Sequence, residues 1–348
     1  MNSKLLHNAL VEWYEMNHRI LPWRETRDPY KIWISEIILQ QTRVAQGMEY
    51  YHRLVTRFPD IQMLAEAQED EVLLYWQGLG YYSRARNMHK AAQLMREHKI
   101  FRHVANEDER CLSNDEIFAA LRSMPGVGDY TAGAIASFAF NLPYPALDGN
   151  VYRVLSRLYD CEIAFDTTQG KKHFRQLAVD LLDKERPRLF NSSIMELGAL
   201  VCLPTKPLCD ECPLCTWCKA LANNTVELLP VRKPRAKVRD RFLEYTIYIT
   251  PEKTTLIHQR KENDIWKHLW EFPLQETERF ADDCFLDVLE LTHVLSHQKL
   301  HARFIIKNVS ELPEIPDTLV VSLSDLDNYA FSRLTLRALE QITSDIFQ

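Results

Sequence analysis

The stretch SNDEIFAALRSMPGVGDYTAGAIASFAF, residues 113–140, decides the fold of the first part of the chain. Ser113 and Glu116 have the spacing of a capping box, and the apolar residues after them recur at helical spacing, which predicts a helix. The PGVG segment 125–128 ends that helix and permits a tight turn into a second one. Such a turn exposes backbone N–H groups beside a helix N-terminus, where a phosphate can bind without basic side chains. An ordinary helix–helix turn is the alternative interpretation.

The same helical spacing of apolar residues extends from Leu5 to about Ala222 and predicts an all-α N-terminal domain over residues 1–222. Residues 223–241, which contain RKPRAK and have no apolar periodicity, predict an exposed basic linker.

The pattern changes after residue 241, where β-branched and aromatic residues become frequent. The segments FLEYTIYIT (242–250), TTLIHQ (254–259) and ARFIIK (302–307) predict strands, whereas DDCFLDVLELTHVL (282–295) predicts a helix. We therefore expect an α+β C-terminal domain over residues 242–348.

The composition of the 348-residue chain, 46% hydrophobic, is sufficient for two domains with their own cores. The net charge of -6 argues against a nucleic-acid partner, but residues 242–348 carry most of the acidity, with 10 Lys and Arg against 18 Asp and Glu. No segment has the length and apolarity of a signal peptide or a membrane span. The expectation is an unexported, cytoplasmic protein, bacterial and associated with the nucleoid through DNA, with no membrane partner.

Five of the eight cysteines fall between Cys202 and Cys218, which indicates metal ligands rather than a disulfide framework. Cys202, Cys209, Cys212 and Cys218 are separated by six, two and five residues, and four thiolates so arranged suit either zinc or a 4Fe-4S cluster. Cys215 adds a second possible set, because 209, 212, 215 and 218 are evenly spaced. Four buried thiols without a ligand are the third interpretation.

Two carboxylates stand out beside predicted helices. Glu36 lies in DPYKIWISEIILQQT (28–42), off the main apolar stripe but on the side of Ile32 and Leu39, so its pKa should be raised. Asp148 precedes a helix, where backbone donors and the helix dipole favour its ionised form. A surface glutamate and a simple N-cap are the alternative interpretations.

On these residues the sequence resembles the MutY family of adenine DNA glycosylases, in the helix-hairpin-helix superfamily of endonuclease III. The string SEIILQQTRV (35–44), the PGVG turn and the cysteine spacing carry the resemblance. It implies a base-excision repair enzyme that removes adenine mispaired with 8-oxoguanine or G in duplex DNA, acting as a monomer.

The same resemblance implies roles for individual residues. Glu36 would be the general acid and base, Asp148 would support the glycosidic carbon, and Asn150 would belong to the catalytic set. One protonated and one ionised carboxyl suit the cleavage of a glycosidic bond through an oxocarbenium-like state. One 4Fe-4S cluster would be held in the loop 202–218, with Cys215 as a bystander and with the ligands Cys202, Cys209, Cys212 and Cys218.

Tyr130 in GVGDYTAG distinguishes between two related classes of glycosylase, those that also cut the DNA strand and those that do not. Superfamily members that also nick the strand carry a lysine there, whose amine forms a Schiff base with the sugar. A phenol cannot form an imine, so the chain is expected to be monofunctional. An endonuclease III-like glycosylase and lyase is the alternative.

The resemblance also implies DNA contacts. In GLGYYSRARNMH (78–89), Tyr81 would wedge into the base stack, assisted by Gln41, as base extrusion requires. Arg24 would be an active-site arginine, and the hairpin glycines Gly126 and Gly128 would lie at the phosphate. On their own, Tyr81 and Tyr82 are reasonably interpreted as core aromatics.

The C-terminal domain resembles the MutT-like (Nudix) domain of the same family through LIHQRKENDIWKHLWEFP (256–273). The magnesium-binding Nudix box is missing, so lesion recognition is expected rather than Nudix hydrolysis. In HVLSHQKL (293–300), Ser296 and His297 match the family's Phe-Ser-His loop, but Leu295 replaces the phenylalanine. A catalytically silent iron-sulfur DNA-binding protein is the last alternative, and the presence of both Glu36 and Asp148 argues against it.

Overall fold

The computed structural model describes residues 3–101, 112–234, 238–261, 264–277 and 288–346. Its contacts divide the chain into two compact units, which are described separately here. The first comprises Met1–Tyr51, Phe58–Gln62 and Ala91–Pro234, and the second comprises His52–Arg57, Met63–Lys90 and Arg235–Gln348.

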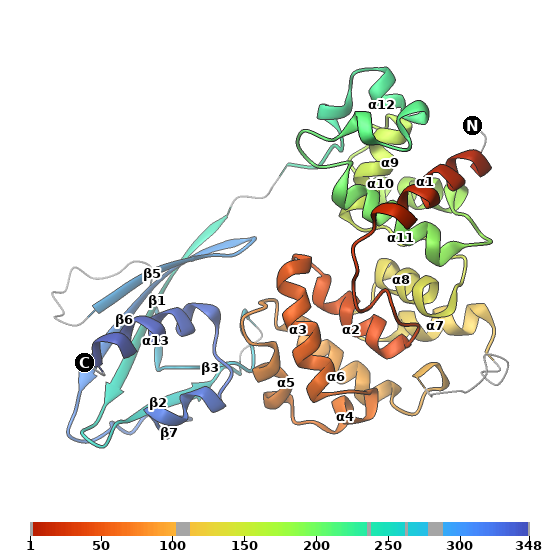
Figure 1. Ribbon diagram of the computed structural model, residues 1–348. Coiled ribbons are helices and arrows are strands. Elements are labelled where there is room, and N and C mark those ends of the chain that lie inside the picture. Colours follow the sequence, from red (N-terminus) through yellow and green to blue (C-terminus); the bar gives the residue numbers. More distant parts are fainter. Residues whose placement is uncertain (1–2, 102–111, 235–237, 262–263, 278–287, 347–348) are drawn as a thin grey trace. The chain divides into compact units, whose positions relative to one another are not determined.

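The part of the chain before residue 223 is helical and, within its described residues, contains no strand, which confirms the all-α prediction (Figure 1). No helix among the described residues combines the length and the apolarity that crossing a membrane requires. The α-helices are α1 (Ser3–Asn17), α2 (Pro29–Leu39), α3 (Val44–Arg57), α4 (Ile61–Glu66), α5 (Glu69–Trp76), α6 (Ser83–Met95), α7 (Asn114–Ser123), α8 (Asp129–Phe140), α9 (Gly149–Tyr159), α10 (Thr168–Leu181), α11 (Pro187–Leu200) and α12 (Lys219–Ala222).

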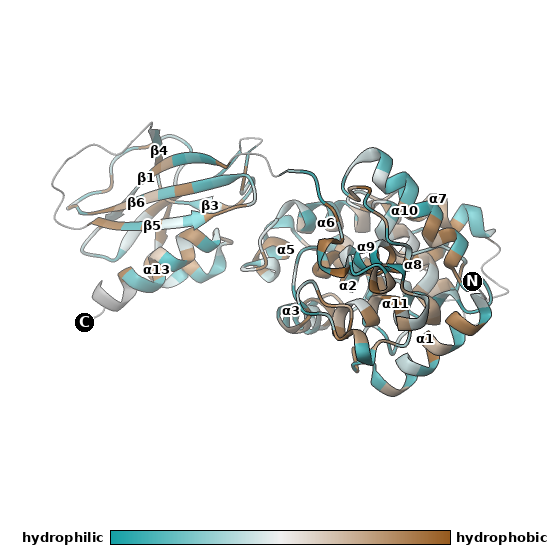
Figure 2. Ribbon diagram, turned by 90° about the horizontal axis from the view of Figure 1, so that it is seen from above, coloured by the Kyte–Doolittle hydropathy of each residue, from teal (hydrophilic) through white to brown (hydrophobic). Residues whose placement is uncertain are grey.

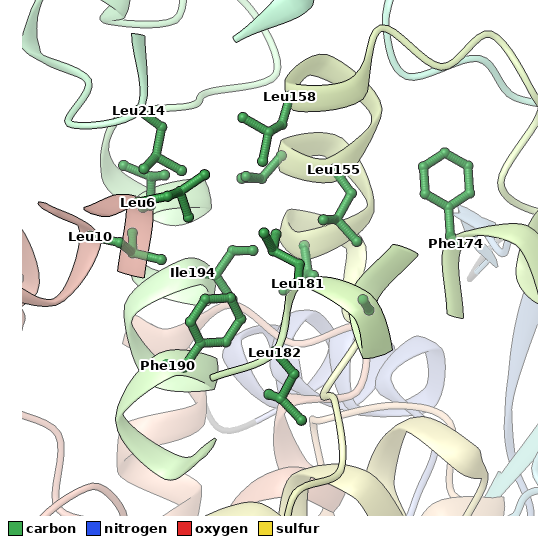
Figure 3. Packing of buried hydrophobic residues seen from close by; sticks show 14 of the residues in the cluster. Leu6, Leu10, Leu155, Leu158, Phe174, Leu181, Leu182, Phe190, Ile194 and Leu214 are labelled. Atoms are coloured by element: carbon green, nitrogen blue, oxygen red, sulfur yellow. The ribbon is translucent and has the colours of Figure 1, made fainter. Parts of the chain in front are cut away.

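Helices α1, α9, α10 and α11 share one hydrophobic core. Leu6 and Leu10 of α1, Leu155 of α9 and Ile194 of α11 are buried together, and Figure 3 shows their side chains converging. Each fully buried Leu or Ile side chain contributes about 1.5–3 kcal/mol relative to an exposed one. Cys202 also packs against this core, so the cysteine loop is attached to it.

The hairpin forms as its local signals predict. Ser113 and Glu116 make both hydrogen bonds of a capping box at the start of α7. Gly126 adopts a φ of 78°, a left-handed value that glycine tolerates best, and Gly128 is the N-cap of α8. The first N–H groups of α8 therefore have no partner within the helix and no side-chain cap from Gly128.

The C-terminal part contains two small sheets. Their strand orders are β4-β1-β6-β5 and β3-β2-β7, with β1 parallel to β6 and antiparallel to β4. Hydrophobic and polar residues alternate along β1 and β6, as Figure 2 shows, so one face of the sheet is buried. Helix α13 (Arg333–Ile346) packs its apolar side on that face. The strands are β1 (Arg239–Ile249), β2 (Thr254–Gln259), β3 (Trp270–Glu271), β4 (Leu274–Thr277), β5 (Val288–Val294), β6 (Gln298–Asn308) and β7 (Leu319–Ser322).

The strands predicted over 242–250, 254–259 and 302–307 are confirmed. The helix predicted over 282–295 is wrong for residues 288–294, which form β5 and pair antiparallel with β6; residues 282–287 lie outside the described residues. The apolar residues of VLELTHV fit both the helical period and the strand period. The segment forms a strand because Leu291 pairs with Ala302 on the buried face of the sheet.

The linker predicted over residues 223–241 is not fully exposed, because part of its first half packs on the helical unit. Leu229 is buried, and the Arg157 guanidinium donates from Nε to the carbonyl oxygens of Val226 (3.0 Å) and Leu229 (3.2 Å). Farther along, the Lys233 backbone N–H donates to Asp166. Residues 223–234 thus pack on the helical unit, residues 235–237 lie outside the described residues, and β1 begins at Arg239. The boundaries 1–222, 223–241 and 242–348 stay predictions.

Candidate active site and cysteine loop

A cavity of about 890 Å³ in the first unit is lined by the end of α2, the hairpin turn and the N-terminus of α9. It gathers eight residues that the sequence singled out from segments far apart in the chain. These are Arg24, Glu36, Gln41, Gly126, Gly128, Tyr130, Asp148 and Asn150.

Glu36 lies on α2, with 3% of its surface exposed. The Tyr130 hydroxyl donates a hydrogen bond to Glu36 Oε2 at 2.7 Å. Burial raises the pKa of Glu36 and the negative charge of Asp148 raises it further, while the Tyr130 hydrogen bond and the charge of Arg24 oppose that rise. The carboxyl therefore holds its proton more tightly than an exposed glutamate, as its apolar neighbours predicted.

Tyr130 is held as a neutral phenol. Burial raises its pKa well above the ordinary value, and the charges of Glu36 and Asp148 act in the same direction. The side chain is thus a hydrogen-bond donor fixed by α8 against the Glu36 carboxyl.

Asp148 is the N-cap of α9, where it accepts hydrogen bonds from the Val151 backbone N–H (2.8 Å) and from Asn150 Nδ2 (2.8 Å). Burial nevertheless raises the pKa of Asp148, against the effect of these donors. The expectation that the helix N-terminus dominates is corrected here, because desolvation is the larger effect. The pKa values of Glu36 and Asp148 are thus both raised above their usual range.

Arg153 extends this network away from the cavity. Its Nη2 donates to Asn150 Oδ1 at 2.9 Å and its Nε donates to the Cys202 carbonyl at 2.6 Å. Hydrogen bonds therefore connect Asp148, through Asn150 and Arg153, to the first residue of the cysteine loop. Sequence reasoning missed Arg153 because a buried arginine inside an amphipathic helix has no local signature.

Sequence reasoning also missed the pair Arg19 and Glu196, which lines the cavity. Arg19 Nε and Nη2 donate to the two carboxylate oxygens of Glu196 at 2.6 and 2.9 Å. This bidentate pair joins the segment after α1 to α11 and shapes one side of the cavity.

Arg24 lines the cavity with its guanidinium 4.9 Å from the centre of the Phe138 ring. Its Nε and Nη1 atoms are buried and have no hydrogen-bond partner among the described residues. Buried donors of this kind are costly, so they point to a polar group that would enter the cavity.

Gln41 and Tyr81 both adopt left-handed backbone conformations, with φ of 60° and 47°. Tyr81 is 47% exposed, whereas its neighbour Tyr82 is buried. The interpretation as a core aromatic is therefore wrong for Tyr81 and right for Tyr82. Non-glycine residues in this region store strain, which is common at binding sites.

The cysteines of the loop 202–218 line one small cavity of about 30 Å³ together with Arg157, and Cys215 lines it too. Arg157 Nη1 donates to Cys202 Sγ at 3.3 Å. Burial raises the pKa of Cys209 and Cys218, and raises that of Cys212 to about 12.

The arrangement of these thiols bears on the choice of metal. Among the described residues, no three His, Cys, Asp or Glu side chains converge as the ligands of a single ion do. Zinc needs four sulfurs about 2.3 Å away, whereas the thiolates of a 4Fe-4S cluster bind separate irons and lie farther apart. Four cysteine thiolates around one small cavity are a donor set that fits a 4Fe-4S cluster and also fits zinc.

Ser296 and His297 form the turn between β5 and β6, closed by a hydrogen bond from the Leu295 N–H to the Gln298 carbonyl at 2.7 Å. Both side chains are exposed, with Ser296 Oγ 3.3 Å from His297 Nδ1. Leu295 packs partly on the core of its sheet. The two polar side chains are thus available to a ligand.

Comparisons with known proteins agree with this geometry. Residues 34–181 match the family described as "HhH-GPD superfamily base excision DNA repair protein", and residues 244–341 match the NUDIX domain family. The first match contains both carboxylates, Tyr130 and the hairpin.

Curated relatives with the name adenine DNA glycosylase are similar over most of the chain. The protein of Buchnera aphidicola subsp. Baizongia pistaciae is 35% identical over 78% of this chain and 74% of its own length. That of Buchnera aphidicola subsp. Acyrthosiphon pisum is 31% identical over 86% of each chain. The rat protein is 42% identical over 61% of this chain and 40% of its own length.

Solved structures share the fold of the helical part. A thermostable thymine-DNA glycosylase superposes with a TM-score of 0.54 at 25% identity, over 64% of this chain and 97% of its own. Endonuclease III in a non-covalent DNA complex superposes with a TM-score of 0.50 at 22% identity, over 64% and 98%.

Proposed function

The chain belongs to the adenine DNA glycosylase family, and on that premise we propose that it excises adenine paired with 8-oxoguanine or G in duplex DNA, without cutting the strand. Removal of adenine in base-excision repair is the activity of the family. The partner base, the monofunctional outcome, the monomeric state and the cytoplasmic location belong to the proposal.

The observation that carries the proposal is the part-buried hydrogen bond from Tyr130 to the buried Glu36, beside Asp148. Glu36 would carry the proton that the reaction needs, because desolvation raises its pKa and so favours the protonated carboxyl. Adenine is a poor leaving group as an anion. A proton delivered by Glu36 to a nitrogen of its five-membered ring makes it a neutral one.

The remaining steps use the second carboxyl. Departure of the base leaves a cationic sugar, which Asp148 in its ionised form stabilises or transiently bonds. Glu36, now deprotonated, accepts a proton from the water that attacks the sugar carbon. Asn150 holds the Asp148 carboxylate toward the cavity through its 2.8 Å hydrogen bond.

The monofunctional outcome rests on Tyr130. A phenol cannot form the Schiff base through which related enzymes cleave the strand. Lys171 also lines the cavity, but it lies on α10 rather than directly after the hairpin, and a different role is proposed for it below.

We propose that Cys202, Cys209, Cys212 and Cys218 would hold one 4Fe-4S cluster and that Cys215 is not a ligand. The cluster would supply a cross-link that closes the loop on α9 and the core. Arg157, which donates to Cys202 Sγ, would stabilise the negative charge of that sulfur.

For the C-terminal domain we propose lesion recognition by hydrogen bonds from Ser296 and His297. Leu295 cannot stack as an aromatic ring does, so recognition would depend on these two polar side chains. Tyr81 would act as the wedge and Gln41 would assist it, which accords with their exposed, strained conformations.

Three duplexes test the proposal, with A opposite 8-oxoguanine, A opposite G and A opposite T. We expect free adenine from the first two and an abasic strand that is cut only after alkali. Strand cleavage without alkali, with stoichiometric trapping by borohydride, would instead support the endonuclease III-like glycosylase and lyase.

A further inference from the structure

A second cavity, of about 290 Å³, adjoins the catalytic one in the first unit. Nothing in the proposed chemistry uses it. Asp129 and Arg175 line it, together with three aromatic side chains, Phe118, Tyr144 and Tyr152. The two cavities share the lining residues Gly128, Tyr130, Leu147, Tyr152 and Lys171.

An anionic group already lies between two cations at this cavity. Asp129, the first residue of α8, pairs with Arg122 of α7 (Nε to Oδ1, 2.8 Å) and with Arg175 of α10 (Nη1 to Oδ2, 3.3 Å). All three side chains are about half exposed. Exposed pairs of this kind contribute little to stability and exchange readily with other ions.

We propose that Lys171 and Arg175 form a binding position for a phosphodiester of the DNA strand that carries the flipped adenine. In the free protein, Asp129 competes for Arg175 and weakens this position. The inference rests on the proposed function, because it takes the substrate to be DNA.

The shared lining carries the argument for a phosphodiester. A nucleoside in the catalytic cavity continues into a phosphate on either side, and Lys171 faces both cavities. Arg175 lies one helical turn beyond Lys171 on α10, so both cations lie on the same side of that helix. Gly128 belongs to both linings, which places the hairpin N–H groups beside the same path.

The local charge around this cavity also supports a phosphodiester at this position. Two carboxylates lie at this cavity, Asp129 in its lining and Asp115, which accepts a hydrogen bond from the lining Tyr144 at 3.2 Å. Three cations, Arg122, Lys171 and Arg175, outnumber them, so this part of an acidic protein is locally basic. A basic patch that includes an internal carboxylate binds phosphate more weakly than the cations alone would. Asp129 thereby limits the affinity for undamaged DNA, which such an enzyme must leave.

The test measures binding of a duplex with A opposite 8-oxoguanine over a series of KCl concentrations, in the Glu36→Gln background, which should bind this duplex without excising the adenine. Each lost phosphate contact should lower the slope of log affinity against log salt by about 0.9. We expect that loss, with weaker binding, for Lys171→Gln and for Arg175→Gln. Lys172→Gln removes the same charge from the adjacent residue, which lines neither cavity, and should keep the parent slope. Asp129→Asn should bind several-fold more tightly.

The inference is wrong if Lys171→Gln and Arg175→Gln match Lys172→Gln in slope and affinity. It is supported if inorganic phosphate, at constant ionic strength, displaces the duplex more readily from the parent than from Lys171→Gln, because the free anion and the phosphodiester would then compete for one position. Adenine release from A opposite 8-oxoguanine is measured on the parent in parallel. Its absence would refute the proposed function itself, whatever the salt slopes.

Discussion

Arg153 donates a hydrogen bond from Nε to the backbone carbonyl of Cys202 at 2.6 Å, and so joins α9 to the start of the cysteine loop. The same guanidinium donates from Nη2 to Asn150 and to the Gly198 carbonyl, at 2.9 and 2.6 Å. Asn150 in turn holds Asp148. A continuous chain of hydrogen bonds therefore connects Asp148 to the cysteine loop.

Arg153→Lys keeps the charge but cannot make three such bonds at once. We expect adenine excision under single-turnover conditions to fall by about tenfold or more, with partial loss of bound iron. Arg186→Lys, which alters an ion pair between a partly exposed arginine and the buried Asp183, is the matched control and should retain both. Full activity and iron content in Arg153→Lys would show that the network does not position Asp148.

The cysteine set is tested by two serine substitutions. Cys215→Ser should keep the brown chromophore and about four irons per chain, because Cys215 is not a ligand. Cys212→Ser should lose both and fold poorly, since the loop loses its cross-link. Iron analysis and visible absorbance measure this, and zinc without iron in anaerobically purified protein would refute the assignment.

The raised pKa of Glu36 predicts how stability depends on pH. The folded carboxyl binds its proton more tightly than the unfolded one, so the folded state loses stability as pH rises through the unfolded and then the folded pKa. Glu36→Gln removes this cost and should raise the thermal midpoint at pH 7. The gain should shrink in acid, where the parent carboxyl is protonated in both states. An equal gain at both pH values would contradict the buried, raised carboxyl.

The exposed turn between β5 and β6 gives a prediction about lesion preference. Ser296→Ala removes a hydroxyl and His297→Ala an imidazole without touching the buried core. Each should lower the preference for A opposite 8-oxoguanine over A opposite G by several-fold, because that preference comes from polar contacts. Ser324→Ala, on another exposed serine of the same unit, is the control. Unchanged preference in both turn variants would remove the turn from lesion recognition.

Local signals explain what could be predicted from the sequence. The capping box at Ser113, the glycines of the hairpin and the regular apolar spacing each act over a few residues, so the helices and the turn followed from them. The proposed catalytic residues could be singled out only through family resemblance, because Glu36 alone is an ordinary glutamate in an apolar helix.

The predictions that were wrong concern features that depend on contacts between residues far apart in the chain. Strand β5 depends on its pairing with β6, and residues 223–234 pack on the helical unit because buried Arg157 binds their carbonyls. The pKa of Asp148 depends on burial by segments far away in sequence, which outweighs its favourable helix N-terminus.

The central claim is that Glu36 is the acid that protonates adenine, and its most direct test is single-turnover excision from A opposite 8-oxoguanine by Glu36→Gln. This substitution keeps the size of the side chain and its hydrogen bond with Tyr130, but removes the proton to be transferred. We expect the rate to fall by a factor of about a hundred or more, with duplex binding nearly unchanged. Asp148→Asn, which removes the charge opposite the cationic sugar, should also slow the reaction with little effect on binding. A Glu36→Gln rate within a few-fold of the parent would contradict the account, because the acid would then lie elsewhere.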